Sequence, residues 1–225
     1  MRMLAEPVGC SAGAPVARPH LAVPYPLGSN PREISTRQLA KLQEQVHAAT
    51  STAERLVAGR NKRELTARRD SNSWSVAECL DHLTQTAYTF LPAIAETVAL
   101  APRLAANQSF RTGLLAQLLI RHLEPPYRIR VKALPQLMPQ RSEFDDAWPA
   151  FLKAQSQFSE TLRASDGFAI DRMTITCPIY ARVHYNAYGA LRMLVAHERR
   201  HLWQIERILG TLDRAENRAE DRAAS

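Results

Sequence analysis

Apolar residues recur every three or four positions in four long segments of the chain, and polar or charged residues fill the positions between them. This spacing follows the 3.6-residue period of an α-helix and not the two-residue period of a strand. The sequence therefore predicts four amphipathic helices, each with one apolar face for a shared core. Their expected ranges are about 34–59, 74–100, 143–164 and 187–209.

Residue types at the ends of these segments indicate where the helices begin and end. Ser75 followed by Glu78 is the pattern of a capping box at the start of the second helix. The first helix should stop near Gly59. Asn186 is a suitable N-cap for the fourth helix, and Gly210 is expected to end it.

The remaining segments predict connections and tails around the helical domain. A shorter apolar run over 110–123 indicates one more helix, and residues 125–132 look extended. Residues 1–31 hold six of the 14 prolines and almost no periodic apolar signal, so we expect a disordered leader. Residues 211–225 form a charged tail. We see no run of alternating strands, so the predicted class is all-α: a four-helix bundle over 32–210 with a short extra helix in its crossover.

Composition excludes several classes of protein. No stretch approaches the ~20 uncharged apolar residues that a bilayer span requires. The three cysteines, Cys10, Cys79 and Cys177, lack the paired spacing of a disulfide framework or a CxxC zinc site, and a reducing cytoplasm is the expected setting. Glu6 and Pro7 stand where a secretory signal needs a continuous apolar core, so we expect no export signal.

The formal net charge of +7 raises the question of an anionic partner, because a basic surface attracts nucleic acid and anionic lipid. The basic residues are dispersed, however, and the densest run lies between two predicted helices without an aromatic residue. We interpret this run as a solvated basic loop, and we expect neither nucleic acid nor a membrane as partner. The run consists of Arg60, Lys62, Arg63, Arg68 and Arg69.

Two histidines, His197 and His201, lie one turn apart in the fourth predicted helix. At about 100° per residue both fall on the apolar stripe, so both imidazoles should point into the core. An unpaired buried polar group costs about 1–3 kcal/mol, and one divalent metal ion satisfies a nitrogen of each ring. Hydrogen bonds to carboxylates or carbonyls of neighbouring helices are the alternative. The opposite arc, expected to face solvent, holds Arg192, Arg199, Arg200, Trp203 and Arg207.

A metal ion that supports chemistry commonly takes three protein ligands and keeps one position open. His82 is the best third candidate, because it lies two turns into the second helix on the shoulder of the apolar stripe. Cys79, one turn earlier, is more simply a small buried hydrophobe. The weaker candidates are His184, His122, His47 and His20.

The segment 197–201 reads HERRH and also matches the HExxH signature of metalloproteases. Both intervening residues are arginines, where those enzymes have uncharged residues. The metzincin extension fails as well, since Gln204 and Arg207 stand where it has Gly and His. A protease would need a mixed sheet beside this helix, and no edge strand is predicted.

Two histidine motifs together resemble those of a known family. Residues 74–83 read WSVAECLDHL and residues 197–205 read HERRHLWQI. They are similar to the WSxxExxxHL and HxxxHxxQI motifs of DinB-like proteins. The stretch 127–132, followed by Pro135 and Pro139, is similar to the mid-chain connection of the family. The similarity covers about residues 33–210.

The resemblance implies a DinB-like four-helix bundle, often dimeric, with a three-histidine site for a divalent metal such as nickel or zinc. Position by position, the implied ligands are His82, His197 and His201. The family includes thiol-dependent transferases and isomerases beside members with no assigned reaction. The implied function is thus a metal-dependent thiol S-transferase, with a small thiol, an electrophile and a second copy of the chain as partners.

Glu198 is the candidate catalytic residue, because it falls near the centre of the inward arc, where it could orient a ligand or take the proton of a thiol. An ion pair with an arginine of a neighbouring helix is the alternative. Arg128, Arg130 and Lys132 could hold the carboxylates of an anionic thiol, or form a solvated loop. A non-enzymatic function also stays open, in which the metal serves as a structural pin in a homodimer.

Overall fold

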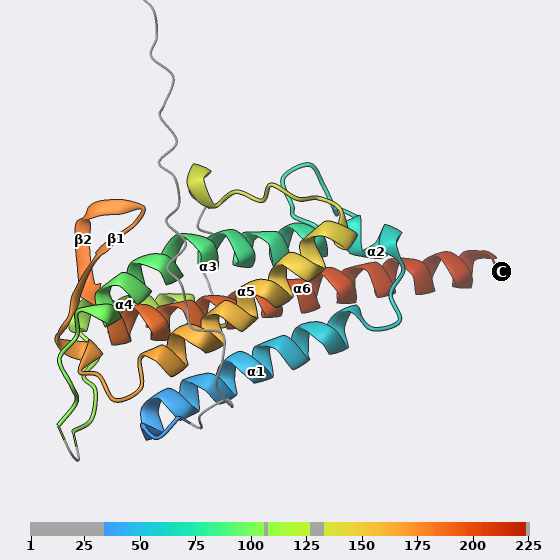
Figure 1. The fold of residues 1–225 in the computed structure, drawn as a ribbon. Helices are drawn as coiled ribbons and strands as arrows, with labels where there is room; N and C mark the ends of the chain where they lie inside the picture. Colours follow the sequence, from blue (N-terminus) through green and yellow to red (C-terminus); the bar gives the residue numbers. More distant parts are fainter. Residues whose placement is uncertain (1–33, 106–107, 127–132, 224–225) are drawn as a thin grey trace, which may run out of the picture. The chain divides into compact units, whose positions relative to one another are not determined.

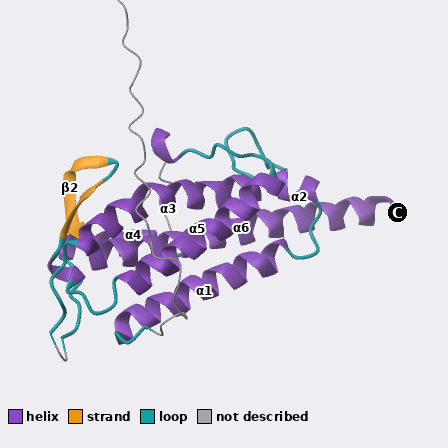
Figure 2. Cartoon of the chain, viewed as in Figure 1, coloured by secondary structure: helices purple, strands orange, loops and turns teal. Residues whose placement is uncertain are grey.

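Four long helices form a bundle in the computed structural model, which describes residues 34–105, 108–126 and 133–223 (Figure 1). They are α1 (Arg37–Val57), α3 (Val76–Ala99), α5 (Phe144–Ala164) and α6 (Ala187–Ala223). The shorter helices are α2 (Lys62–Thr66), α4 (Leu114–Leu123) and two 3-10 turns, η1 (Pro135–Leu137) and η2 (Ile170–Arg172). Helix dominates the described residues (Figure 2), and this confirms the predicted all-α class.

The apolar faces of the four long helices meet in two core clusters. α3 packs on both α5 and α6, and α1 packs against α5 and α6. The first cluster includes Leu39 and Phe158, and the second includes Leu80, Phe151 and Ile205. Full burial of such a side chain contributes roughly 1.5–3 kcal/mol. This burial holds α3 beside α6, which is the contact on which the candidate site depends.

The predicted capping signals are confirmed at the starts of α3 and α6. The Glu78 N–H donates to Ser75 Oγ over 3.2 Å, and the Ser75 N–H donates to Glu78 Oε2 over 2.9 Å, which completes the capping box. At α6 the Gly189 N–H donates to Asn186 Oδ1 over 2.7 Å. Gly59, just beyond α1, has a φ of 74°, a left-handed conformation that glycine adopts without strain.

The prediction that Gly210 ends the fourth helix is wrong. α6 continues to Ala223. Gly210 is not among the described glycines with positive φ, which are Gly59 and Gly167. The extension is held by tertiary contacts, because Leu212 packs against the second core cluster and Asp213 pairs with Arg60.

A two-stranded hairpin precedes α6, although no strands were predicted. β1 (Thr174–Cys177) pairs antiparallel with β2 (Tyr180–Asn186). Ile175 and Tyr185 are register partners and both are buried. β2 ends at Asn186 and α6 begins at Ala187, so the hairpin leads directly into the last helix.

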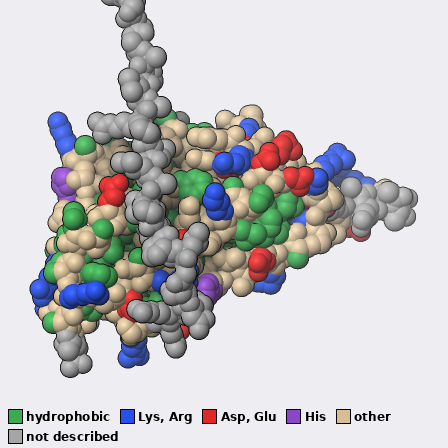
Figure 3. Space-filling view, in the orientation of Figure 1, with side chains coloured by type: hydrophobic (Ala, Val, Ile, Leu, Met, Phe, Trp, Pro, Cys, Tyr) green, Lys and Arg blue, Asp and Glu red, His purple; other side chains and the backbone are tan. Residues whose placement is uncertain are grey.

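The basic run between α1 and α3 is largely exposed, as expected, but part of it is a short helix and not a loop. Lys62–Thr66 forms α2, in which the Glu64 N–H donates to Asn61 Oδ1 over 3.0 Å. Arg60 pairs with Asp213, and Arg68 pairs with Glu78. On the face drawn in Figure 3, basic and acidic side chains are interspersed.

Several predictions concern segments outside the described residues. These are the leader 1–31 and the extended part of the crossover at 127–132, which contains Arg128, Arg130 and Lys132. His20 and Cys10 lie outside as well. In the part of the chain that the structure describes, no helix combines the length and the apolar character needed to cross a bilayer.

Candidate metal centre

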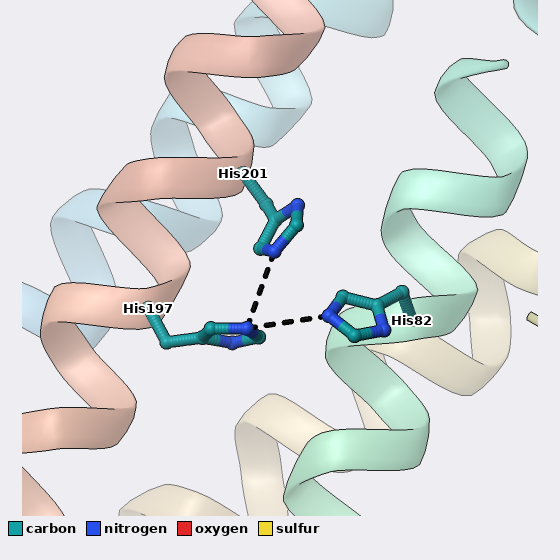
Figure 4. Close-up of side chains that lie close together, drawn as sticks. All are labelled: His82, His197 and His201. Atoms are coloured by element: carbon teal, nitrogen blue, oxygen red, sulfur yellow. Dashed lines mark hydrogen bonds between the residues drawn. The ribbon is translucent and has the colours of Figure 1, made fainter. Parts of the chain in front are cut away.

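The imidazoles of His82, His197 and His201 converge between α3 and α6 (Figure 4). The Nε2 atom of His197 lies 3.2 Å from Nε2 of His82 and 3.2 Å from Nε2 of His201. A ligand atom from each ring lies within 4.8 Å of those of the other two. The structure thus brings together the three side chains named from the sequence, and it shows no second group of this kind among the described residues.

Helix geometry explains why the rings meet. His197 and His201 stack on one face of α6, one turn apart, and Asn186 sets where that helix begins. His82 lies two turns into α3, whose start is fixed by the capping box. His82 and His201 are buried and His197 is half-buried.

A backbone carbonyl holds the His82 ring in one orientation. Nδ1 of His82 lies 2.6 Å from the carbonyl oxygen of Leu137 in η1. A carbonyl oxygen only accepts, so Nδ1 carries the hydrogen and donates it. In the neutral ring Nε2 then carries a lone pair, which faces the other two imidazoles. Metal-binding histidines commonly donate their second nitrogen in this way.

Hydrogen bonds alone do not satisfy the three facing nitrogens. A neutral ring nitrogen carries either one hydrogen or one lone pair, and His197 Nε2 has two close neighbours. The hydrogen or lone pair on His197 Nε2 can therefore point well at only one of these two neighbouring nitrogens. His201 Nδ1 is also buried without a hydrogen-bond partner among the described residues, although the Gln204 side chain interacts with that ring. A cation bonded to all three Nε2 atoms removes the conflict between them.

The spacing of the nitrogens fits a bound divalent metal. Zinc bonds imidazole nitrogen at about 2.0–2.1 Å, which places two ligand atoms of a tetrahedral site roughly 3.3 Å apart. The two Nε2 separations of 3.2 Å match this value. Imidazole donors suit zinc and nickel alike. The residues present therefore fit the metal that the sequence led us to expect.

Burial keeps the three rings in the neutral form that binds metal. It lowers the pKa of His82, against which the Leu137 hydrogen bond and Asp81 act in the opposite direction. It lowers the pKa of His197 and His201 well below the ordinary value, and repulsion from neighbouring cationic groups adds to the effect. A ligand must be deprotonated to coordinate, so this environment favours metal binding.

Glu198 is buried beside the cluster and bonds to α5 instead of to an arginine. Gln155 Nε2 donates to Glu198 Oε1 over 2.6 Å, while Glu198 Oε2 has no hydrogen-bond partner among the described residues. Burial raises the pKa of Glu198 to about 8, although Gln155 and Arg199 act to lower it. No ion pair of Glu198 is found within the described residues, which goes against that alternative.

A small cavity of ≈ 10 Å³ adjoins the centre between α3, α5 and α6. Its wall is mostly apolar, with Glu198 and the His197 ring as its main polar groups. A reacting molecule larger than water would have to widen this space. The lining residues are Leu83, Thr86, Ala87, Phe158, Leu194, His197 and Glu198.

Three neighbours of the centre were not predicted as part of it. They are the Leu137 carbonyl, the Gln155 amide and the Trp74 ring. Trp74 lies with its centroid 4.8 Å from the His82 ring and 6.0 Å from the His201 ring, so it covers the cluster from one side. Its place just before the capping box was the available signal, because a residue there packs onto the first turns of the helix.

The other candidate ligands lie apart from the cluster. His184 is on the hairpin, with Nδ1 3.2 Å from Thr176 Oγ1. His122 Nδ1 contacts the Leu118 carbonyl, and His47 contacts Gln43. Cys79 is fully buried in the second core cluster, as expected for a small hydrophobe, and burial raises the pKa of its thiol.

One residue of the arc expected to face solvent is buried. Arg200 is 7% exposed, and its Nη1 donates to the carbonyl of His122 in α4 over 3.1 Å. The long side chain reaches back to the last turn of α4, where a cation is favourable. Arg199 stays near the surface, paired with Glu124.

The sheet that a metalloprotease would need is not found in the described residues. The strands there form the two-stranded antiparallel hairpin, which precedes α6 and does not flank the HERRH turn. This agrees with the sequence, in which the protease signature is incomplete.

Comparison with protein families gives one match, to the family model of the DinB superfamily, over residues 45–205. Comparisons with curated proteins and with solved structures gave no match. The matched range contains His82, His197 and His201, all of α3 and α5, and the first half of α6. It also spans well over half of the chain. The chain therefore belongs to the DinB superfamily.

Proposed function

We propose that this protein binds one divalent metal ion, nickel or zinc, through His82, His197 and His201, and uses it to transfer a small thiol to an electrophile. The convergence of these three imidazoles, with His197 Nε2 3.2 Å from Nε2 of each of the other two, carries the proposal. No fourth His, Cys, Asp or Glu joins the group within the described residues. A three-ligand site leaves a position for substrate, as catalytic metal sites do.

The metal, when bound, would supply positive charge that lowers the pKa of an incoming thiol. The chain's own residues would do the rest. Glu198 lines the cavity beside the His197 ring, and its Oε2 has no partner among the described residues, so we assign this atom to accept the thiol proton. Gln155 keeps the carboxyl in place through Oε1.

In the proposed reaction a sulfur–carbon bond forms and the bond from that carbon to its leaving group breaks. The sulfur supplies the electron pair, the leaving group departs with the pair of the broken bond, and the thiol proton moves to Glu198 Oε2. Once the cavity has widened to admit the thiol, its apolar walls, including Leu83 and Phe158, would exclude water from the sulfur. Arg128, Arg130 and Lys132 remain the proposed contacts for a carboxylate on the thiol.

The runner-up is a non-enzymatic bundle in which the metal is a structural pin. All three imidazoles come from one chain, so a metal held by them would link α3 to α6 within a protomer. The three-ligand set favours a site for a substrate, whereas the small cavity of ≈ 10 Å³ beside it favours the structural pin. A homodimer and a cytoplasmic setting remain part of the proposal.

The deciding experiment combines metal analysis with thiol conjugation. The purified full chain is analysed for bound metals, then assayed with a chromogenic electrophile and glutathione, cysteine or coenzyme A in turn. We expect one metal per chain and conjugation faster than the uncatalysed rate with at least one thiol. Bound metal with no acceleration by any thiol would favour the structural pin, and absence of metal in wild-type protein after reconstitution would overturn the proposal.

A further inference from the structure

Asp81 is a buried carboxylate that precedes His82 on α3 and ties a distant loop to that helix. Its exposed fraction is 0%. Oδ2 accepts hydrogen bonds from the backbone N–H of Gln140 over 2.6 Å and of Arg141 over 2.9 Å. Oδ1 accepts from Arg141 Nη1 over 2.7 Å. Three donors from one loop thus converge on one side chain, and the loop is fixed against α3 at that point.

The same loop supplies the carbonyl that orients His82. Leu137 lies three residues before Gln140, with Met138 and Pro139 between them. Three residues span about 10 Å at most, and proline restricts its own φ, so the link is short and stiff. The anchor at Asp81 therefore limits where the Leu137 carbonyl can lie relative to α3, together with the burial of the Leu137 side chain.

We propose that Asp81 is a positioning residue of the metal centre: by holding residues 140–141 it places the Leu137 carbonyl where it accepts the His82 Nδ1 hydrogen and leaves the Nε2 lone pair facing His197 and His201. The inference rests on the metal binding of the proposed function for its role, but the arrangement itself can be tested without metal. Asp81 makes no described hydrogen bond to His82, His197 or His201. It acts on the centre through the Leu137 carbonyl, which orients His82.

The first test reads the tautomer of His82 in the metal-free full chain by nitrogen-15 NMR of the imidazoles. Wild-type protein should show His82 in the Nδ1–H form. In Asp81→Ala the loop loses its anchor, and the Nε2–H form should appear beside it. An unchanged, single Nδ1–H tautomer in Asp81→Ala would overturn the proposal. A purely structural role for Asp81 would leave the tautomer as it is.

The second test measures zinc affinity by competition with a chelator. Loss of a group that orients a metal ligand typically weakens binding by about 10–100-fold, and we expect this range for Asp81→Ala. Arg141→Ala should change the affinity by less than about 3-fold, because the two backbone donors still reach Asp81. Wild-type affinity in Asp81→Ala would contradict the proposal.

Glu78→Gln is the matched control. Glu78 is also a buried carboxylate of α3, and it accepts from Arg68 and from the Ser75 N–H, but it makes no contact with the loop 137–141 among the described hydrogen bonds. It should lower stability through the lost ion pair with Arg68 and leave the tautomer and the zinc affinity unchanged, because a Gln at this position still completes the capping box. An equal loss of zinc affinity in both variants would show a general effect of stability and overturn the proposal.

Pro139→Gly provides a second route if Asp81→Ala does not fold. This change keeps Asp81 and loosens only the link from Gln140 to Leu137. We expect a mixed His82 tautomer and a measurably weaker zinc affinity, and wild-type values for both would count against the proposal. If wild-type protein binds no metal at all, the proposed function fails, while the tautomer comparison still decides the role of Asp81.

Discussion

Gln155 Nε2 donates a hydrogen bond of 2.6 Å to Oε1 of Glu198, and Oε2 of the same carboxyl is buried without a partner among the described residues. This relationship holds the carboxyl of Glu198 at the wall of the cavity that His197 also lines. It separates the role of Glu198 from that of the metal ligands, because Glu198 can be changed without removing a ring nitrogen.

Glu198→Gln should keep the bound metal and lose conjugation activity. The substituted amide still accepts from Gln155 at its oxygen but no longer takes a proton, and loss of a general base typically lowers the rate by about 10²–10⁴-fold. Metal content and kcat/KM are measured on the same preparation. Glu206→Gln, an exposed change on the same helix, is the control and should behave as wild type. Full activity in Glu198→Gln would remove Glu198 from the mechanism.

His197→Ala and His201→Ala should each abolish stoichiometric metal binding, because two imidazoles alone make a much weaker site. Elemental analysis of the purified variants measures the content. His184→Ala should retain the wild-type content, since that ring lies on the hairpin beside Thr176. Equal metal in wild type and His201→Ala would exclude the centre described here.

The hydrogen bonds of Asp166 at the start of α1 should stabilise the fold at neutral pH and be lost in acid. Its carboxylate accepts from the backbone N–H of Ser35 and Thr36 over 2.8 and 2.9 Å. Burial acts to raise the pKa of Asp166, but these hydrogen bonds outweigh it and lower the pKa below 3.8. The unfolded chain therefore takes up the proton first, so the contribution is present above about pH 4 and is lost as the pH falls through the folded pKa.

Asp166→Asn should therefore lower the free energy of unfolding by about 0.5–1 kcal/mol at pH 7, at the low end because the carboxyl is partly exposed. The difference from wild type should shrink as the pH falls below about 4. Urea unfolding at pH 7, 5 and 3.5 measures it. Glu54→Gln, an exposed change on α1, is the control. A difference that stays constant with pH would refute this account.

Gly189→Ala should lower the stability of the protein, and Gly210→Ala should raise it. A Cβ at Gly189 would lie 2.8 Å from the Cβ of Ala116 and 2.8 Å from Asn186 Oδ1, so Gly189→Ala should push α4 from α6 and cost about 1–3 kcal/mol. A Cβ at Gly210 meets only the end of Arg214, at 3.6 Å. Gly210→Ala should thus stabilise α6 by about 0.5–1 kcal/mol. Urea midpoints compare the two variants, and a stabilised Gly189→Ala would contradict the packing described.

The sequence predicted the helices where short-range signals decide them. The capping box at Ser75 and the N-cap at Asn186 act within one turn, and both are confirmed. The prediction that the helix ends at Gly210 was wrong because Leu212 packs on the second core cluster and Asp213 pairs with Arg60. No local sequence pattern reveals these distant contacts. The hairpin was missed because a strand of four residues, such as Thr174–Cys177, is too short for alternation to stand out.

The residues of the candidate site also fall into two groups: those that a local sequence pattern predicts and those that only the fold brings together. The spacing of His197 and His201 on one helix is visible in the sequence, and the family motif adds His82. The Leu137 carbonyl carries no signature, since every residue has one, and it meets His82 across 55 positions of chain. Gln155 was equally hidden, because it is one polar residue on the buried face of α5.

The direct passage from β2 into α6 fixes the rotational phase of the last helix. Asn186 closes the hairpin and caps α6, and the two imidazoles follow about three turns later. Inserting a single residue between Asn186 and His197 would swing both rings by about 100° around the helix axis and aim them away from His82. The hairpin thus sets the direction in which the two imidazoles point, and lengthening its tip at residues 178–179 would leave that direction unchanged.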